Sequence, residues 1–306
     1  MRCLVLGADG FLGSHLVDGL LSKGFEVRAF ARFSEGKSKN LEHLRDKIEF
    51  VAGDFLNQDD IDKATKDIDI VFHFVSFTTP ASSINDPLID IDTNIRGTVQ
   101  LLEKCAKNGV KQLVFPSSGG TVYGNISKDM FSEDDLTMPV SPYGISKLTI
   151  ERYLEYFKIN FGLNYLALRY SNPYGTRQNL AGGQGIIPIF LNRIKTGEPI
   201  TIFGDGENVR DYIYVGDCVD LTMQILSKED RAFNLYNVGS GVPISINDLV
   251  RVIQKVTGKE FSIERLPDRS CYLKKVVLDN TRLLQEVGSR GLVGLEEGIE
   301  LMWKSI

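Results

Sequence analysis

The amino-acid sequence predicts an α/β fold, in which a doubly wound parallel sheet is followed by a smaller α/β domain. Through the first half of the chain, short runs rich in β-branched residues alternate with longer segments of helical periodicity. A glycine-rich turn follows the first of these runs, beginning at Gly7. The length of 306 residues suits one large α/β unit or two unequal domains.

The alternation places each element in order. Strands are expected at residues 2–7, 26–31, 48–53, 68–74, 111–117 and 165–170. Helices are expected between them, at residues 11–22, 58–65, 86–107 and 142–161. Because strands and helices alternate in this way, the strands should lie parallel in one sheet.

Beyond Asn172-Pro173 the alternation loosens into glycine-rich loops. Short strands are expected at 199–203 and 211–215, and helices at 246–257 and 295–304. We therefore interpret residues 1–172 as the first domain and residues 173–306 as a smaller domain that completes a cleft over the carboxyl edge of the sheet. Residues 216–240 are expected to rejoin the first domain as a helix and a strand.

Composition and charge exclude several classes of protein. The net charge of -5 and the pI near 5.4 give no basic field for nucleic acid. Cys3, Cys105, Cys218 and Cys271 are scattered without C-x-x-C spacing, which argues against a zinc site or a disulfide framework and fits a reducing cytoplasm. Met1 begins a strand directly, and no apolar run approaches the length of a membrane span, so we expect neither secretion nor a membrane anchor.

The turn Gly7-Ala-Asp-Gly10-Phe-Leu-Gly13 follows a strand and opens a helix, which is the context that a dinucleotide-binding fingerprint requires. The glycines would permit the tight turn, the approach of the backbone to a diphosphate, and close helix packing. The helix begins with Phe11 and Leu12, and its N-terminus would face the phosphates. The sequence therefore predicts a Rossmann-like dinucleotide-binding domain.

The end of the second predicted strand bears on the choice of cofactor. An NAD site usually places an acidic residue here for the ribose 2′-hydroxyl, whereas this chain has Ala31-Arg32. These residues favour NADP, with Ser34 and Lys37 as possible helpers, although an exposed arginine could instead stack on adenine. Asp54, after the third strand, is a candidate adenine contact or a turn residue.

Tyr143 and Lys147 point to a specific chemistry. Residues four apart share one face of a helix, so the Lys147 ammonium can lie beside the Tyr143 ring and favour its phenolate. Lowering a phenol pKa from about 10 to neutrality needs about 3 units, or roughly 4 kcal/mol, and the positive ring of an oxidised nicotinamide would add to the effect of the ammonium. Tyr143 is therefore a candidate general base, although a surface helix can also carry this pair by chance.

A run of small residues, Ser117-Ser118-Gly119-Gly120-Thr121, follows the fifth predicted strand, close to where nicotinamide should lie. A hydroxyl here could donate to a sugar oxygen and shuttle its proton to Tyr143, although such runs also simply turn the chain. The chain has only three histidines. His73 ends an apolar strand where core packing explains it, so a Ser-His-Asp hydrolase is disfavoured.

Nearly the whole chain resembles the extended short-chain dehydrogenase/reductase family, most closely its UDP-galactose 4-epimerases. The resemblance is carried by the glycine turn, Asp92-Thr-Asn94-Ile-Arg-Gly, Val122-Tyr123-Gly124, Tyr143-x-x-x-Lys147, Asn172-Pro173 and Arg210-Asp-Tyr212. It implies NAD as the cofactor, contacted by Asp54, Phe55, Phe74, Val75, Asn94, Tyr143, Lys147 and Tyr170. It also implies a nucleotide-sugar site lined by Asn172, Phe203, Arg210, Tyr212 and Arg269, with the two arginines clamping the diphosphate.

The same resemblance implies a homodimer, in which helices 86–107 and 142–161 pair with those of a second copy into a four-helix bundle. The apolar positions that allow such packing are Leu101, Leu102, Tyr153, Leu154 and Phe157. Burial against the chain's own sheet is the alternative for some of them.

One departure from the epimerase pattern concerns the catalytic hydroxyl. The family's Ser/Thr position is Gly119 here, so we expect the hydroxyl to come from Ser118 or, as second choice, from Thr121. Related 4,6-dehydratases and decarboxylases resemble one another in carrying acidic residues just before Val-Tyr-Gly. This chain has Gly120 and Thr121 there, so elimination is disfavoured.

Two further departures concern the substrate. The acidic residue that usually stands three after the second arginine is Tyr272, which puts its contacts to the uridine ribose in doubt. Val276 stands seven beyond Arg269, where epimerases restricted to glucose-type sugars often have a tyrosine. A smaller side chain could admit an N-acetyl group.

The sequence therefore predicts a nucleotide-sugar 4-epimerase for a UDP-hexose or a UDP-N-acetylhexosamine. Tyr143 would remove the C4-hydroxyl proton, Ser118 would relay it, and hydride would pass from C4 to nicotinamide and back. A 4-ketoreductase of a deoxysugar nucleotide, which consumes NADPH, would use the same residues. A redox-sensing regulator that binds NADP without catalysis is a third hypothesis, which the intact Tyr143-Lys147 pair disfavours.

Overall fold

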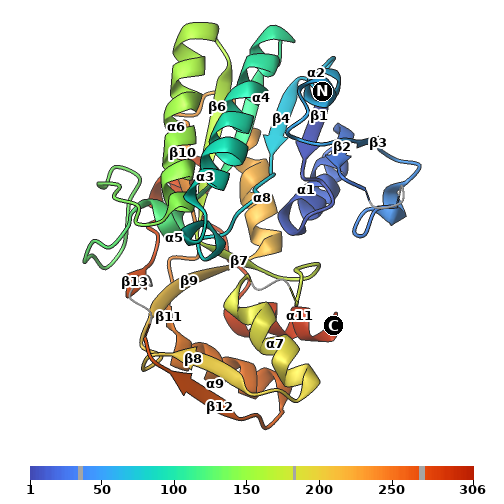
Figure 1. Cartoon of the computed structure of the whole chain (residues 1–306). Coiled ribbons are helices and arrows are strands. Elements are labelled where there is room, and N and C mark those ends of the chain that lie inside the picture. The colour runs from blue at the N-terminus through green and yellow to red at the C-terminus, as the bar shows by residue number, and fades with distance from the viewer. Residues whose placement is uncertain (34–36, 182–183, 269–272) are drawn as a thin grey trace.

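The computed structural model describes residues 1–33, 37–181, 184–268 and 273–306. Its larger part is a seven-stranded parallel sheet in the order β10-β6-β5-β4-β1-β2-β3. The strands are β1 (Arg2–Leu6), β2 (Glu26–Ala31), β3 (Glu49–Ala52), β4 (Ile70–His73), β5 (Gln112–Ser118), β6 (Asn164–Tyr170) and β10 (Leu235–Val238). A smaller part lies below this sheet in Figure 1.

Helices cover both faces of the sheet. One face carries α1 (Phe11–Ser22), α8 (Val215–Leu226) and α10 (Thr281–Val287), and the other carries α2 (Gln58–Ala64), α4 (Arg96–Lys107) and α6 (Pro142–Phe161). Successive side chains of a strand point to opposite faces, so Cys3 and Val5 of β1 enter the first core while Leu4 and Leu6 enter the second. The predicted doubly wound α/β fold is thus confirmed.

Local sequence sets the ends of α6. The Ser141 Oγ accepts a hydrogen bond from the Gly144 N–H at 3.2 Å, and Pro142 occupies the first helical position. Gly162 ends the helix with a φ of 70°, in the left-handed region that glycine adopts without strain. The predicted bounds of this helix are confirmed.

The segment predicted as one helix over residues 86–107 is interrupted. Helix α3 (Pro87–Ile89) leads into a π-helical segment, Asp90–Ile95, and then into α4. Asp90 and Asn94 are the buried residues of this segment. π-Helical turns are frequent at functional sites, which draws attention to this segment.

The smaller part consists mainly of residues beyond 172. Strand β9 (Val209–Tyr214) pairs with β7 (Asn172–Tyr174), β11 (Pro243–Ser245) and β13 (Lys275–Val276), while β8 (Ile200–Phe203) pairs with β12 (Ile263–Leu266). Helices α7 (Ile186–Thr196), α9 (Ile246–Thr257) and α11 (Leu295–Lys304) share a hydrophobic core with these strands. The division of the chain into two domains remains our interpretation.

Several elements begin and end at the predicted residues, namely β2, α1, α6, α9 and α11. Helices α7 and α10 and the short strands β7, β11, β12 and β13 were not predicted from the sequence. Within the described ranges, no helix combines the length and the apolar character needed to cross a membrane.

Candidate active site

The glycine turn between β1 and α1 leaves no room for a side chain at Gly7 or at Gly13. Gly7 has a φ of 76°, and a Cβ there would lie 2.8 Å from the Phe74 carbonyl oxygen. A Cβ on Gly13 would collide with the Gly7 carbonyl oxygen. Among the described residues, no side chain caps α1 at Gly10, so the backbone N–H groups of its first turn remain available to an anion. This cradle fits the diphosphate of a dinucleotide.

The residues predicted to meet the adenine end of the cofactor differ in exposure. Arg32 is exposed at the end of β2. The Asp54 Oδ1 accepts a hydrogen bond from the Leu56 N–H at 2.9 Å, which is the turn role given above as its alternative. The buried Phe55 ring stacks on His73 with 4.9 Å between ring centroids. The ring of Phe55 therefore belongs to the core on one face of the sheet. Lys37 is exposed, and Ser34 lies outside the described residues.

Other predicted cofactor residues lie at the carboxyl edge of the sheet. The Phe74 N–H bonds to the Leu6 carbonyl oxygen at 3.0 Å, beside the glycine turn. Val75 lines the same small cavity as Tyr143 and Lys147. The buried Tyr170 hydroxyl forms a hydrogen bond with the Thr222 Oγ1 of α8 at 2.6 Å. The Tyr170 ring packs in the hydrophobic core between the sheet and α8.

Tyr143 and Lys147 lie together on α6, next to the end of β5. The Lys147 Nζ donates a hydrogen bond to the Pro116 carbonyl oxygen at 2.8 Å and lies 5.5 Å from the centroid of the Tyr143 ring. The Tyr143 N–H donates to the Ser83 Oγ at 3.2 Å, from the short 3₁₀ turn Ser82–Ile84. The structure thus brings together the two residues that the spacing singled out.

The electrostatics of this pair correct one expectation. Burial raises the pKa of Tyr143 to about 12, the charge of Asp90 adds to the rise, and a hydrogen bond from Ser118 opposes it. Burial also lowers the pKa of Lys147 to about 8, while the charges of Asp90 and Glu151 raise it. Lys147 is therefore mostly charged at neutral pH, whereas burial holds the Tyr143 phenol in its neutral form. A bound oxidised nicotinamide, whose ring is positive, would favour the phenolate.

The structure explains why position 119 is glycine. A Cβ there would lie 2.5 Å from the Leu278 Cδ1, so Leu278 occupies the space of a side chain. The neighbouring Ser118 hydroxyl is the one that bonds with Tyr143. The Thr121 Oγ1 is buried and, among the described residues, has no hydrogen-bond partner. Ser118 therefore remains our first choice for the catalytic hydroxyl, and Thr121 the second.

A polar cluster beside the pair was not found from the sequence. The Asp90 side chain, on a residue 1% exposed, accepts hydrogen bonds at Oδ1 from the Thr78 Oγ1 and the Asn94 Nδ2, both at 2.9 Å. Asn94, predicted to contact the cofactor, also accepts from the Phe77 N–H at 3.1 Å and so holds the loop after β4. A single small cavity is lined by His73, Asp90, Asn94, Tyr143 and Lys147, among others.

A buried ion pair next to the catalytic residues holds α6 against β6. Glu151, one helical turn beyond Lys147, pairs with Arg169 of β6 at 2.7 Å, and both side chains are buried. Glu151 also accepts a hydrogen bond from the Ser117 Oγ at 2.5 Å, next to Ser118. The end of β5 and the helix that carries Lys147 are therefore fixed to the same carboxylate. Removing one partner of such a pair typically costs about 3–5 kcal/mol.

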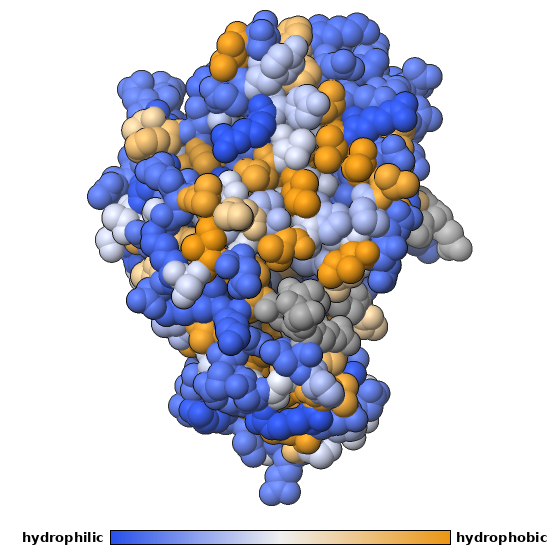
Figure 2. Space-filling view, turned by 60° about the vertical axis from the view of Figure 1, so that its left-hand side comes forward, coloured by the Kyte–Doolittle hydropathy of each residue, from blue (hydrophilic) through white to orange (hydrophobic). Residues whose placement is uncertain are grey.

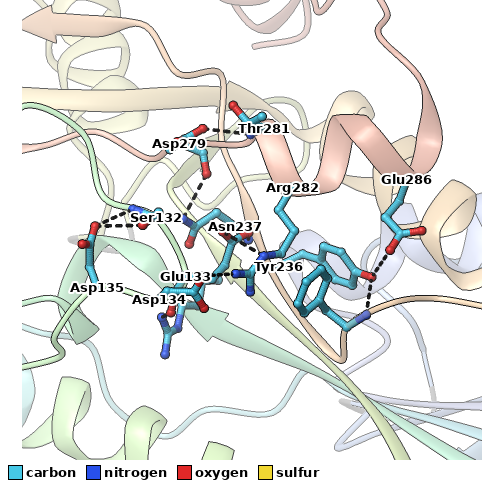
Figure 3. A network of polar contacts seen from close by, with 12 residues as sticks. Ser132, Glu133, Asp134, Asp135, Tyr236, Asn237, Asp279, Thr281, Arg282 and Glu286 are labelled. Carbon is cyan, nitrogen blue, oxygen red and sulfur yellow. Dashed lines mark hydrogen bonds and ion pairs between the residues drawn. The ribbon is translucent and has the colours of Figure 1, made fainter.

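The network continues from Arg169 toward the C-terminal part of the chain. Arg169 donates to the Tyr123 hydroxyl at 3.0 Å, and Tyr123 donates to the Asn237 Oδ1 at 2.7 Å. The Asn237 N–H in turn donates to Glu133 at 2.7 Å. Figure 3 shows Arg282 of α10 reaching toward Glu133, with their closest atoms 3.6 Å apart. These contacts tie the loop before α6 to β10 and α10.

The residues predicted to bind the nucleotide sugar gather around β9. Asn172 of β7 stands opposite Tyr212, and its Nδ2 donates to the Asp211 carbonyl oxygen at 2.8 Å. Arg210 stands opposite Val276 of β13. The pairing of β7 with β9 therefore places Asn172 beside Tyr212, with Arg210 two residues earlier on β9.

The remaining substrate predictions have mixed outcomes. Phe203 ends β8, in the separate two-stranded sheet. Val276 is 2% exposed and packs in a hydrophobic cluster with Val122 and Leu278. Its expected role in admitting an N-acetyl group stays a prediction. The second arginine of the proposed clamp, Arg269, lies outside the described residues, as does Tyr272.

Sequence comparison gives consistent matches. The NAD dependent epimerase/dehydratase family matches residues 3–239. A UDP-glucose 4-epimerase of Mycolicibacterium smegmatis is 36% identical over 302 residues, which cover 98% of this chain and 96% of that protein. A dTDP-4-dehydro-6-deoxyglucose reductase of Escherichia coli is 32% identical over 309 residues, covering 99% of this chain and 96% of the reductase.

Structural comparison agrees with these matches. The crystal structure of a UDP-glucose 4-epimerase of Thermotoga maritima with UDP-glucose has a TM-score of 0.92 and 37% identity, covering 100% of this chain and 98% of that one. The family description specifies NAD, as the resemblance implied, and gives no support to the preference for NADP drawn from Ala31-Arg32. These matches agree with the glycine cradle and the Tyr143-Lys147 pair, and they show that the chain belongs to the NAD dependent epimerase/dehydratase family.

Proposed function

We propose that this protein is a nucleotide-sugar 4-epimerase, which inverts C4 of a UDP-hexose or a UDP-N-acetylhexosamine. The observation that carries the proposal is the convergence of the Ser118 hydroxyl and the Lys147 ammonium on Tyr143, at the sheet edge that also holds the glycine cradle. The similarity of the chain to UDP-glucose 4-epimerases in both sequence and structure supports it.

In the proposed reaction, Tyr143 takes the proton from the C4 hydroxyl and later returns it. Ser118 donates its own proton to the Tyr143 oxygen and accepts the proton of the C4 hydroxyl in its place, so that it relays the proton to Tyr143. Lys147, mostly charged at neutral pH, stabilises the phenolate. When bound, NAD supplies the acceptor for the C4 hydride and the donor that returns it to the opposite face.

The protein contributes binding as well as acid–base chemistry. The glycine cradle and the first turn of α1 would hold the cofactor diphosphate. Asn172, Arg210 and Tyr212 would hold the nucleotide sugar, and a guanidinium matches the geometry of a diphosphate. Binding of the nucleotide leaves the sugar ring free to turn its other face to the cofactor, which epimerisation requires.

The proposal is tested by incubating the purified protein and NAD with a panel of UDP- and dTDP-sugars. We expect galactose- and glucose-type sugars, or their N-acetylated forms, to interconvert without net change in cofactor absorbance. A steady consumption of NADPH with a 4-keto sugar would instead indicate the ketoreductase. That alternative is favoured by the similarity to the E. coli dTDP-4-dehydro-6-deoxyglucose reductase.

The choice of hydroxyl gives a direct prediction. Ser118→Ala should lower the turnover number by about 10- to 150-fold, the worth of a hydrogen bond to a charged group. Thr121→Val should cost less, because the Thr121 Oγ1 is buried and not bonded to Tyr143. Comparison of the steady-state kinetics of the two variants shows which residue supplies the catalytic hydroxyl. A larger loss at Thr121 would move the catalytic hydroxyl to that residue.

We also propose a homodimer formed through α6 and the segment before α4. The structure corrects the residues expected at this interface, because Leu101, Leu102, Leu154 and Phe157 are buried in the chain's own core. Figure 2 shows apolar side chains gathered on one face of the molecule. The exposed apolar residues of these segments are Leu88, Ile89, Ile91, Ile145, Tyr153, Tyr156, Ile159 and Phe161.

Light scattering at micromolar concentration should therefore give the mass of a dimer. Ile159→Glu should give a monomer, because Ile159 is 72% exposed and a charge there would be buried by a second copy. Ile263→Glu, at an exposed isoleucine of β12, is the control and should remain dimeric. A monomeric wild-type protein would contradict the proposal.

A cytoplasmic location is part of the proposal. Cys3, Cys105 and Cys218 are buried and unpaired, as suits a reducing compartment. Nucleic acid is not expected as a partner of a chain with a net charge of -5.

A further inference from the structure

Asp90 is a buried carboxylate for which the proposed mechanism has no role. It is the first residue of the π-helical segment and is 1% exposed. The Thr78 hydroxyl and the Asn94 amide both donate to its Oδ1, at 2.9 Å. Among the residues that the structure describes, none donates a hydrogen bond to its Oδ2. A carboxylate buried with one oxygen unpaired is costly, so its retention calls for another interaction.

The interaction available to it is with the catalytic pair. Asp90 lines the same small cavity as Tyr143 and Lys147. Its charge acts on both, raising the pKa of Tyr143 and that of Lys147. The remaining titratable side chain among the residues that line this cavity, His73, is neutral because burial lowers its pKa to about 3. Asp90 is therefore the anion that this cavity presents to the Lys147 ammonium.

We propose that Asp90 is a positioning residue of the reaction, whose carboxylate keeps Lys147 charged and sets the pH range in which the Tyr143-Lys147 pair works. Thr78 and Asn94 hold the carboxylate in place, and the π-helical turn presents Asp90 and Asn94 to the cavity together. The inference deepens the proposed epimerase function and rests on it.

The sign of the effect follows from the charges that face the pair. Lys147 is acted on by Asp90 from the π-helical segment and by Glu151 from its own helix, and Glu151 is already paired with Arg169. Removing the charge of Asp90 lowers the pKa of Lys147, so the ammonium is lost at lower pH. It also lowers the pKa of Tyr143, so the phenolate forms at lower pH. Both limbs of the pH–rate profile should therefore move in the same direction.

The test compares Asp90→Asn with wild type across the pH range of activity. Asparagine preserves the shape of the side chain and can still accept from Thr78. We expect the whole profile to move to lower pH by about one unit, the lower end of the shift that a nearby charge produces. Asp92→Asn, on an exposed carboxylate of the same segment, is the matched control and should leave the profile in place. A uniform loss of activity at every pH would show a merely structural role and overturn the proposal.

A second measurement does not depend on turnover. NMR titration of ¹³C-labelled lysine side chains in the apo-protein follows Lys147 directly, and its signal is identified by its absence in Lys147→Arg. Asp90→Asn should lower the titration midpoint of Lys147, and Asp92→Asn should not. An unchanged midpoint in Asp90→Asn contradicts the inference. If the wild type epimerises no sugar, the proposed function fails, and this titration still decides the role of Asp90.

Discussion

Tyr143→Phe should lower the turnover number by at least about 100-fold, the lower range for losing a positioned acid–base group. The substitution removes only the hydroxyl that takes the C4 proton. The ring stays in its place 5.5 Å from the Lys147 Nζ, and the backbone contact with Ser83 is unaffected. Affinity for the nucleotide sugar should therefore change little.

The comparison of steady-state kinetics with calorimetric binding of the nucleotide sugar checks this expectation. Tyr153→Phe is a matched control, because Tyr153 lies on the same helix, is 36% exposed and has no part in the proposed chemistry. Activity close to wild type in Tyr143→Phe would remove the acid–base mechanism. Loss of substrate binding in the same variant would instead make Tyr143 a binding residue.

Gly13→Ala should weaken NAD binding by about 5- to 150-fold, which corresponds to the roughly 1–3 kcal/mol cost of an added methyl group in a packed site. The new Cβ would collide with the Gly7 carbonyl oxygen, and the turn can relieve this only by opening. An opened turn no longer presents the first N–H groups of α1 to a diphosphate.

Titration of the apo-protein with NAD measures this effect. Gly291→Ala is the control, because a Cβ there has nothing within 4 Å. The control should bind NAD as the wild type does. Unchanged NAD affinity in Gly13→Ala would place the cofactor diphosphate elsewhere.

The elements that local sequence defines could be predicted most closely. Helix α6 has a serine N-cap, a proline in its first turn and a glycine at its end, so both of its bounds were readable. The strands of the parallel sheet are short apolar runs between helices and were found for the same reason. The strands that were missed, β7, β11, β12 and β13, are only two to four residues long and pair with distant segments, as β13 does with β9. Such pairings leave no local periodicity to detect.

The same distinction holds for the site. Tyr143, Lys147 and the glycine turn are motifs with fixed spacing and were identified from the sequence. Asp90 was not, because it lies 53 positions before Tyr143 and reaches it only through the packing of the π-helical segment against α6.

The electrostatics of the pair could not be predicted either. A spacing of four residues shows that Lys147 can approach the phenol, but not that both groups are removed from water. Burial raises the pKa of Tyr143 to about 12, which reverses the shift that the spacing alone implied. The pairing of Glu151 with Arg169 likewise depends on α6 lying against β6.

The central claim is that hydride leaves C4 and returns to C4 of the same sugar. The most direct test incubates UDP-galactose deuterated at C4 with the protein and NAD, and locates the label in the UDP-glucose formed by NMR and mass spectrometry. We expect the deuterium to be retained at C4 after inversion, with no incorporation of hydrogen from solvent or from added NADH. Loss of the label to a cofactor pool, or the absence of any C4-inverted product from the UDP-sugars tested, would contradict it.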